Sequence, residues 1–192
     1  MTEWKDGKCR CWWANPKNET YVRYHDEEWG VPSHDDHHLF EMLVLESFQA
    51  GLSWECVLNK REAFREAFDN FDLDKVCAYT QEDEARLKEN PGIIRNRLKI
   101  RAAVNNARIF REIQKEYQSF SNYIWHWTDG RVIYEQGKTS SELSDRVSKD
   151  LKKRGMKFVG TTIIYSYMQA VGIIYSHDDA CFLAQGSHHR DV

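Results

Sequence analysis

Proline is scarce in this sequence, with only 3 in 192 residues, and no internal repeat or low-complexity segment interrupts it. Forty-one per cent of the residues are hydrophobic and 13% are aromatic, which is enough to build a sizeable core. This composition excludes a disordered or fibrous chain and favours a helical globular protein. We expect a single globular unit over residues 1–192, with a flexible tail at 183–192.

We expect neither a secretory signal nor a membrane span. The first ten residues, MTEWKDGKCR, lack the apolar stretch of an export signal, so we expect a cytoplasmic protein. Residues 158–175 form 18 positions without a formal charge, but Thr161, Thr162, Ser166 and Gln169 interrupt them. We therefore expect a buried helix there and no association with a membrane.

The cysteines are few and odd in number. Five of them in a chain without an export signal argue against a disulfide framework and for free thiols or metal ligands. His177 and Cys181 stand four apart, so one helical turn would direct both to one ion, and Cys11 and His25 offer a matching pair. Two sulfurs and two nitrogens suit a closed tetrahedral zinc site that ties the two ends of the chain together. Cys9 is an alternative to Cys11 as the first of these four metal ligands.

Positive charge is concentrated in the second half of the chain. Residues 1–90 carry 11 Lys and Arg against 20 Asp and Glu, whereas residues 91–192 carry 16 against 10. This asymmetry favours a phosphate-binding face on the second half, although solvated helix faces would produce the same pattern. The basic residues group as Arg95, Arg97, Lys99 and Arg101, and as Lys149, Lys152, Lys153, Arg154 and Lys157.

Glu46 is the most unusual residue of the sequence because it lies within the apolar segment LFEMLVLESFQAGLSW. A helix that buries the apolar residues here would also bury Glu46. An unpaired buried carboxylate is costly and persists only where it is paired, protonated or used, so Glu46 is a candidate functional residue. The alternative is that Glu46 lies at the edge of the apolar stripe and caps a neighbouring element.

Hydrophobic periodicity and capping residues predict an all-α fold of roughly eight to ten helices. Asp36 is expected to be the N-cap of the segment that contains Glu46, and Ser53 the N-cap of a single helix over 54–68. The stretch 128–140 is the least helical and is expected to hold a small hairpin or a plain loop. Trp12 and Trp13 are expected in the core. The predicted helices span about 36–49, 54–68, 73–79, 81–89, 95–117, 119–127, 143–154 and 161–172.

Residues 155–160, GMKFVG, connect the last two predicted helices. Glycines at both ends permit a left-handed backbone, and the turn leaves free amides at the start of the following helix. Free amides at a helix N-terminus bind phosphate, and the preceding KDLKKRG supplies long-range attraction. Although two glycines in a helix connection are common, the surrounding charge makes this segment similar to the helix-hairpin-helix element that binds DNA.

Several long motifs occur in one order: CWW, YHDEEWGVP, LFEMLVLESFQAGLSW, GIIRNRLKI, LKKRGMKFVGTTIIYSYMQAVG and HDDAC. Together they resemble the 3-methyladenine DNA glycosylase I family of the helix-hairpin-helix superfamily, over about residues 9–182. The resemblance implies a monofunctional enzyme that flips N3-methylated adenine out of duplex DNA and hydrolyses its glycosidic bond. It also implies a monomer that acts on double-stranded DNA containing alkylated bases.

The same resemblance assigns roles to particular residues. Glu46 is the expected catalytic residue, and a structural Zn²⁺ is expected on Cys11, His25, His177 and Cys181. The base pocket is expected to comprise Tyr21, Tyr24, Trp29, Trp54 and Ser166. DNA binding is expected at Lys153, Gly155, Lys157 and Gly160.

Three positions depart from the family or superfamily pattern. The aspartate that assists water attack elsewhere in the superfamily is replaced here by Ser176. Cys9 is an additional cysteine, and Phe48 stands where a polar residue is expected. Two other classes of protein remain open: a zinc-stapled DNA-binding module without catalysis, and a zinc hydrolase of small substrates, which would need an open coordination position.

Overall fold

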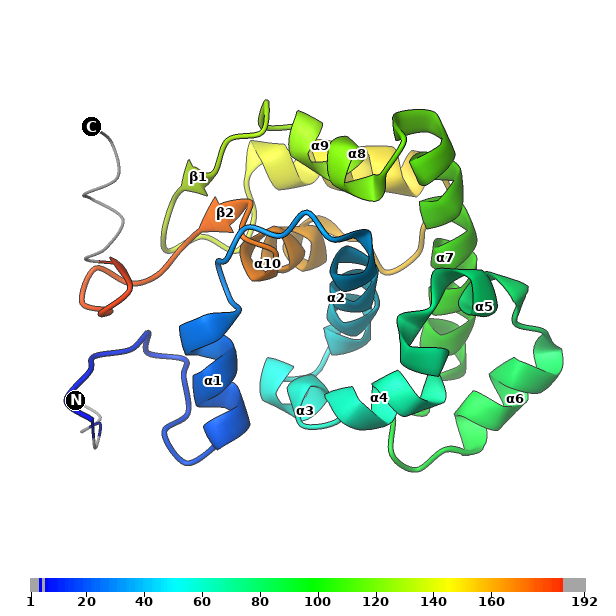
Figure 1. Ribbon diagram of the computed structural model, residues 1–192, viewed down its shortest axis with the longest axis horizontal. Helices are drawn as coiled ribbons and strands as arrows, with labels where there is room; N and C mark the ends of the chain where they lie inside the picture. The colour runs from blue at the N-terminus through cyan, green and yellow to red at the C-terminus, as the bar shows by residue number, and fades with distance from the viewer. Residues whose placement is uncertain (1–3, 5, 185–192) are drawn as a thin grey trace.

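The computed structural model describes Trp4 and residues 6–184, and within these residues it contains ten α-helices (Figure 1). The predicted all-α class is therefore confirmed. Residues 183 and 184 are packed, with Ala184 buried, and the remainder of the predicted tail lies outside the described residues. The helices are α1 (Glu19–Glu27), α2 (Asp36–Gln49), α3 (Trp54–Leu58), α4 (Arg61–Ala67), α5 (Leu73–Ala78), α6 (Gln81–Glu89), α7 (Arg97–Tyr117), α8 (Phe120–His126), α9 (Glu142–Lys153) and α10 (Thr161–Ala170).

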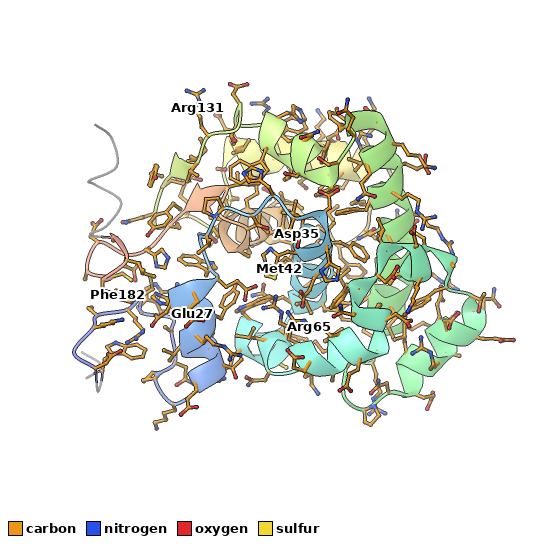
Figure 2. The ribbon with its side chains drawn as sticks, viewed as in Figure 1. Glu27, Asp35, Met42, Arg65, Arg131 and Phe182 are labelled. Atoms are coloured by element: carbon orange, nitrogen blue, oxygen red, sulfur yellow. The ribbon has the colours of Figure 1, made fainter. Side chains whose placement is uncertain are left out.

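Helix α2 forms the centre of the molecule, and most of its length is buried. Ten of its residues, from Leu39 to Phe48, are buried. It packs against α10, α3, α7 and α8, which surround it (Figure 1). Met42 points into this centre, whereas Arg131 and Phe182 lie at the periphery (Figure 2). Within the described residues, no helix is both long enough and apolar enough to cross a membrane.

The N-terminus of α2 corrects one prediction. Its N-cap is Asp35, which accepts a hydrogen bond from the amide of His37, and Asp36 is the first helical residue. Asp36 instead accepts from the amides of Phe120 and Ser121 at 2.8 and 2.7 Å. Its carboxylate therefore satisfies free amides at the start of α8, a role that depends on two helices being brought together.

Several elements differ from the predicted pattern. The predicted helix over 54–68 is broken into α3 and α4 at Asn59 and Lys60. Helix α1 was not predicted, and a 3-10 turn (Asp69–Phe71) follows α4. The predicted hairpin or loop at 128–140 contains a short strand β1 (Ile133–Tyr134) that pairs in parallel with β2 (Ile174–Tyr175). A parallel partner 41 residues away in sequence cannot be inferred from local pattern.

The end of α10 lies directly against the connection between α1 and α2. Gly172 follows α10 with φ of +75°, and a Cβ there would lie 2.3 Å from backbone atoms of Val31 and Pro32. The amide of Ser33 donates to the carbonyl of Val171 at 3.0 Å, and that of Gly30 donates to Gln169. Only glycine permits this approach, which brings α1 and α10 to the same side of α2.

A buried ion-pair network joins α1, α2 and α4. Glu41 on α2 is 2% exposed and accepts from Arg61 Nε at 2.8 Å and Arg65 Nε at 2.7 Å. Arg61 also donates to Glu28 at 2.7 Å, and Glu28 contacts His38. Although burial opposes ionisation, the arginine hydrogen bonds prevail and hold the pKa of Glu41 below its usual value. The network fixes the position of α4 against the central helix.

Replacing Glu41 with Gln should destabilise the fold by about 3 kcal/mol, because it leaves two guanidinium groups without their shared carboxylate. Urea unfolding followed by circular dichroism would measure this loss. Glu62→Gln is the matched control, since Glu62 pairs with Arg65 at the exposed surface and should contribute little. Equal stabilities for the two variants would contradict a structural role for the buried network.

Candidate active site and metal centre

A pocket of about 300 Å³ lies where α1, α2, α3, α10 and the N-terminal arm (residues 6–18, ahead of α1) meet. Helix α2 contributes Glu46 from its buried side, close to its C-terminal end. The predicted catalytic residue Glu46 and the five residues predicted to form the base pocket all line this one cavity. Its lining consists of Trp12, Trp13, Tyr21, Tyr24, Trp29, Glu46, Gln49, Trp54, Ser166 and Gln169.

Glu46 is only 3% exposed, and its Oε2 has no hydrogen-bond partner among the described residues. Burial raises the pKa of Glu46 from 4.5 to about 8, because no positive group among residues 6–184 compensates the lost hydration. Trp54 Nε1 is likewise buried without a partner. An unpaired acceptor and an unpaired donor in one pocket are the features expected where a polar ligand completes the site.

Aromatic rings form the walls of the pocket. Tyr24 and Trp54 have ring centroids 5.3 Å apart, and Trp13 lies 5.4 Å from Tyr21 and 4.9 Å from Trp29. Burial raises the pKa of Tyr21 to about 12 and that of Tyr24 well above its usual value. Both phenols are therefore neutral at physiological pH. The lining is mainly aromatic, and Glu46 is the single ionisable carboxyl group among the lining residues.

Four lining residues were not predicted from the sequence, and two of them correct a prediction. Trp12 and Trp13 were expected in the core, but Trp12 is 86% exposed and Trp13 is half-buried at the pocket. Gln49 and Gln169 also line it. The sequence could have predicted these two glutamines in part. Gln49 follows Glu46 by three residues and Gln169 follows Ser166 by three, so each pair shares a helix face.

Two departures from the family pattern lie away from the pocket lining. Phe48 is fully buried against Phe64, with ring centroids 4.8 Å apart, so its apolar character serves the core. Ser176 is buried and donates its hydroxyl hydrogen to the carbonyl of Glu135. Neither residue changes the chemistry of the cavity around Glu46.

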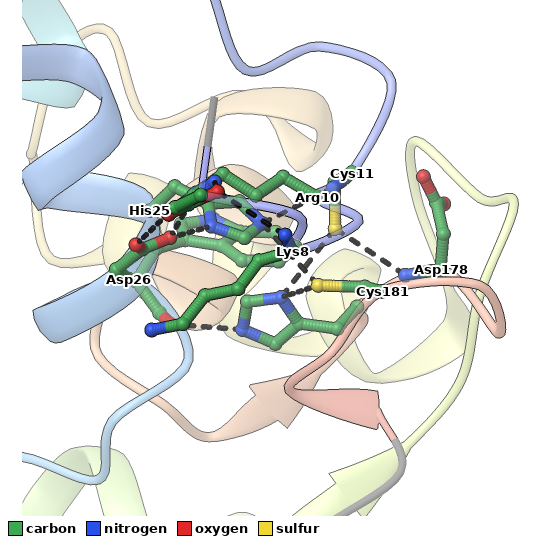
Figure 3. A network of polar contacts seen from close by, with 10 residues as sticks. Lys8, Arg10, Cys11, His25, Asp26, Asp178 and Cys181 are labelled. Carbon is green, nitrogen blue, oxygen red and sulfur yellow. Dashed lines mark hydrogen bonds and ion pairs between the residues drawn. The ribbon is translucent and has the colours of Figure 1, made fainter. Parts of the chain in front are cut away.

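The four candidate metal ligands converge at one buried point beside the pocket. The ligand atoms of Cys11, His25, His177 and Cys181 all lie within 4.8 Å of one another (Figure 3). Cys11 Sγ lies 3.4 Å from His177 Nδ1, and Cys181 Sγ lies 3.5 Å from His25 Nε2. These spacings match the edge of about 3.6 Å in a tetrahedron with ordinary zinc–sulfur and zinc–nitrogen distances. His177 and Cys181 are presented by a turn, not by the predicted helical turn.

Neighbouring groups fix the orientation of the two candidate histidine ligands. Asp26 accepts from His25 Nδ1 at 2.7 Å and is itself held by Arg10 at 2.8 and 2.6 Å (Figure 3). His177 Nε2 lies 3.2 Å from the carbonyl of Trp29, which only accepts, so this nitrogen carries the hydrogen. His25 Nε2 and His177 Nδ1 therefore carry the lone pairs that a metal ion would take, and in this structure His25 Nε2 accepts from the amide of Cys11 at 3.2 Å. The residues present fit a tetrahedral metal ion and its supporting shell.

The connection between α9 and α10 forms a tight hairpin held by α7. Asn106 on α7 accepts from the amide of Lys157 at 2.9 Å and donates to its carbonyl at 2.8 Å. Gly155 has φ of +99°, which requires glycine, whereas Gly160 has φ of −63° and space beside it for a side chain. Gly160 is the N-cap residue of α10. It has no side chain that could accept hydrogen bonds from the first amides of the helix, so it leaves them uncapped. Lys153, at the end of α9, and Lys157, in the hairpin, are both exposed.

Solved structures share this fold over most of their length. A crystal structure of 3-methyladenine DNA glycosylase I superimposes with a TM-score of 0.87 at 46% identity, covering 91% of this chain and 98% of the other. A complex of a variant of such an enzyme with 3-methyladenine has a TM-score of 0.84 at 37% identity, covering 86% and 92%. The fold is therefore that of a helical DNA glycosylase.

Sequence comparison narrows this class to one family. DNA-3-methyladenine glycosylase 1 of Escherichia coli (strain K12) is 45% identical over 184 residues, covering 93% of this chain and 98% of the relative. The model of the methyladenine glycosylase family matches residues 12–184. The chain belongs to the methyladenine glycosylase family.

The raised pKa of Glu46 predicts how stability depends on pH. Between pH 4.5 and about 8 the folded protein keeps a proton on Glu46 that the unfolded chain has released, so this group lowers stability as pH rises. Glu46→Gln should therefore melt at a higher temperature than the wild type at pH 8, with a difference that shrinks towards pH 5. Melting curves at both pH values would measure it. A variant that is less stable at pH 8 would indicate a scaffold role.

Proposed function

We propose that this protein removes N3-methyladenine from duplex DNA by hydrolysing the N-glycosidic bond of a nucleotide flipped into the pocket. The supporting observation is the unpartnered, desolvated carboxyl group of Glu46 inside an aromatic cavity of about 300 Å³. Membership of the methyladenine glycosylase family and the existence of relatives named for this activity support the same substrate. The base enters the pocket because flipping costs least for a damaged pair.

The charge of the lesion explains how Glu46 selects it. Methylation at N3 gives the nucleotide base a positive charge, whereas ordinary adenine is neutral. In the free protein Glu46 holds a proton because burial raises its pKa to about 8. A cationic base beside the carboxyl group offsets the cost of ionisation, and a neutral base does not. Glu46 then accepts hydrogen bonds from the edge of the base as a carboxylate.

The aromatic walls add to this discrimination. Trp54 and Tyr24 form one aromatic pair in the lining of the cavity, and Trp13 and Tyr21 form another. A cation over such a ring is stabilised by roughly 0.5 to 2 kcal/mol per good contact. Because the methylated base is already a good leaving group, the enzyme needs selection and orientation more than strong acid catalysis. Trp29 and Ser166 complete the proposed base-binding set.

Backbone contacts are proposed for the α9–α10 hairpin. The amides at the start of α10 and the exposed Lys153 and Lys157 would bind phosphates on one strand without reading sequence. Arg154 is less available, since it pairs with Asp150 and Glu116. Gly155 and Gly160 keep this backbone accessible to the strand. We propose that the protein acts as a monomer, in the cytoplasm, where the DNA it repairs lies.

A structural Zn²⁺ is proposed for the cluster of Cys11, His25, His177 and Cys181. Four protein ligands leave no open position, so the ion would tie the N-terminal arm to the C-terminal segment and supply no chemistry to the reaction. This closed donor set argues against a zinc hydrolase. A DNA-binding module without catalysis would leave the buried Glu46 carboxyl group without a purpose, so an enzyme is the better supported function.

Glu46→Gln should lower the rate of N3-methyladenine excision by roughly ten- to a hundredfold, because a charge-assisted hydrogen bond is lost in a desolvated pocket. Wild-type kcat/KM should rise with pH up to about 8 and then level, and the variant should lack this dependence. Chromatographic release of free base from methylated duplex would measure both. A variant that excises at the wild-type rate would remove Glu46 from the proposed mechanism.

Purified protein should contain one zinc ion per chain by elemental analysis. Cys181→Ala should lose the ion and melt at a lower temperature, because the arm and the C-terminal segment are no longer joined. Cys9→Ala is the matched control, since Cys9 is exposed and lies outside the four-ligand cluster. Retention of full zinc by Cys181→Ala, or its loss from Cys9→Ala, would contradict the ligand set.

A further inference from the structure

Trp12 is exposed to an extent unusual for its size. Its side chain is 86% exposed, the largest fraction among the large hydrophobic residues that the described part of the chain presents to solvent. It nevertheless lines the mouth of the cavity that contains Glu46. Exposed indole surface is unfavourable in water, and tryptophan is frequent where a partner covers it.

The backbone of Trp12 is held firmly on both sides. Its amide donates to Asp178 Oδ2 at 3.0 Å. The amide of Asp178 donates in turn to Cys11 Sγ at 3.3 Å, as Figure 3 shows. Cys11 is 1% exposed within the candidate metal cluster. The next residue, Trp13, packs against His25 and Trp29 with centroid distances of 5.1 and 4.9 Å. The indole of Trp12 is thus held outward at the rim by a fixed backbone.

The pocket lining divides into an inner part and a rim. Glu46, Tyr24 and Trp54 are at most 9% exposed and form the inner part, which is suited to the base. A nucleotide whose base occupies this inner part must leave its deoxyribose and phosphates at the mouth. Trp12 is the strongly exposed aromatic side chain at that position. Its large apolar face is complementary to the carbon face of a deoxyribose, and it carries no charge to bind phosphate.

We propose that Trp12 packs against the deoxyribose of the extruded nucleotide and holds it at the mouth of the pocket while the base lies inside. This role rests on the proposed function, because it requires a flipped nucleotide. It assigns Trp12 to the substrate outside the base, separately from the residues that select the charge of the base. The contact would form only with a nucleotide in DNA and not with the free base.

Trp12→Ala should therefore lower the single-turnover rate of excision from methylated duplex by about tenfold, a loss typical of one removed aromatic contact to a nucleotide. The affinity for free 3-methyladenine, measured by calorimetry, should change by less than about twofold. Trp12→Phe should recover most of the rate, since a ring is retained. Melting temperature and zinc content should match those of the wild type, because the substituted side chain is exposed.

Two further variants serve as references. Tyr134→Ala removes another exposed aromatic side chain, 63% exposed and outside the pocket lining, and should excise at the wild-type rate. Trp54→Ala, inside the pocket, should weaken both excision and free-base binding. Wild-type excision by Trp12→Ala would overturn the proposal, and so would an equal loss in Tyr134→Ala or a parallel loss of free-base affinity in Trp12→Ala. Failure of the wild-type protein to excise would instead overturn the proposed function.

Discussion

The burial of the Glu46 carboxyl group is the constraint around which the pocket is built. Helix α2 is buried along ten consecutive residues, so a carboxyl group on it loses its hydration as soon as the core forms. In the part of the chain that the structure describes, no positive group pairs with it, and the carboxyl group keeps a proton at neutral pH. This arrangement costs stability and creates an affinity for a ligand that carries its own positive charge. The methylated base is such a ligand.

A second carboxylate on the same helix makes the contrast clear. Glu41 precedes Glu46 by five residues, which places it on a different side of α2. It is buried to the same degree, yet two arginines from α4 satisfy it and keep it ionised. Glu41 therefore binds the fold together, and Glu46 remains available to a ligand. The difference lies in the partners that other helices supply, and not in burial.

The candidate metal centre and the pocket share a wall. Trp29 lines the pocket and lies edge to face with His177, with centroids 4.6 Å apart, and its carbonyl accepts from the same imidazole. Trp12 and Trp13 follow Cys11 directly and line the pocket as well. A metal ion held there would fix the arm that forms this wall. The N-terminal arm thus belongs to the site, although it adds no charged group to the cavity.

Much of this protein can be predicted from local pattern. Hydrophobic periodicity, capping residues and helix-breaking residues identify most of the helices, because helices are determined by hydrogen bonds and side chains close in sequence. Glu46 is recognisable as an anomaly, and the thiols and imidazoles at 11, 25, 177 and 181 are recognisable by type and spacing. The family resemblance, rather than periodicity, links Tyr21, Trp54 and Ser166 to the same pocket.

Other features depend on residues that meet only in the folded chain. Asp36 satisfies amides of α8, 84 residues further along the chain, and β1 pairs with β2 across 41 residues. The sequence predicts Trp12 to be a core residue because it gives only the hydrophobicity of the side chain. In the folded chain the hydrogen bond from the Trp12 amide to Asp178 holds this residue at the mouth of the pocket. Whether a buried carboxylate is paired, as Glu41 is, or left for a ligand, as Glu46 is, depends on which helix packs beside it. Local propensity carries no information about these long-range partners, so only tertiary packing decides them.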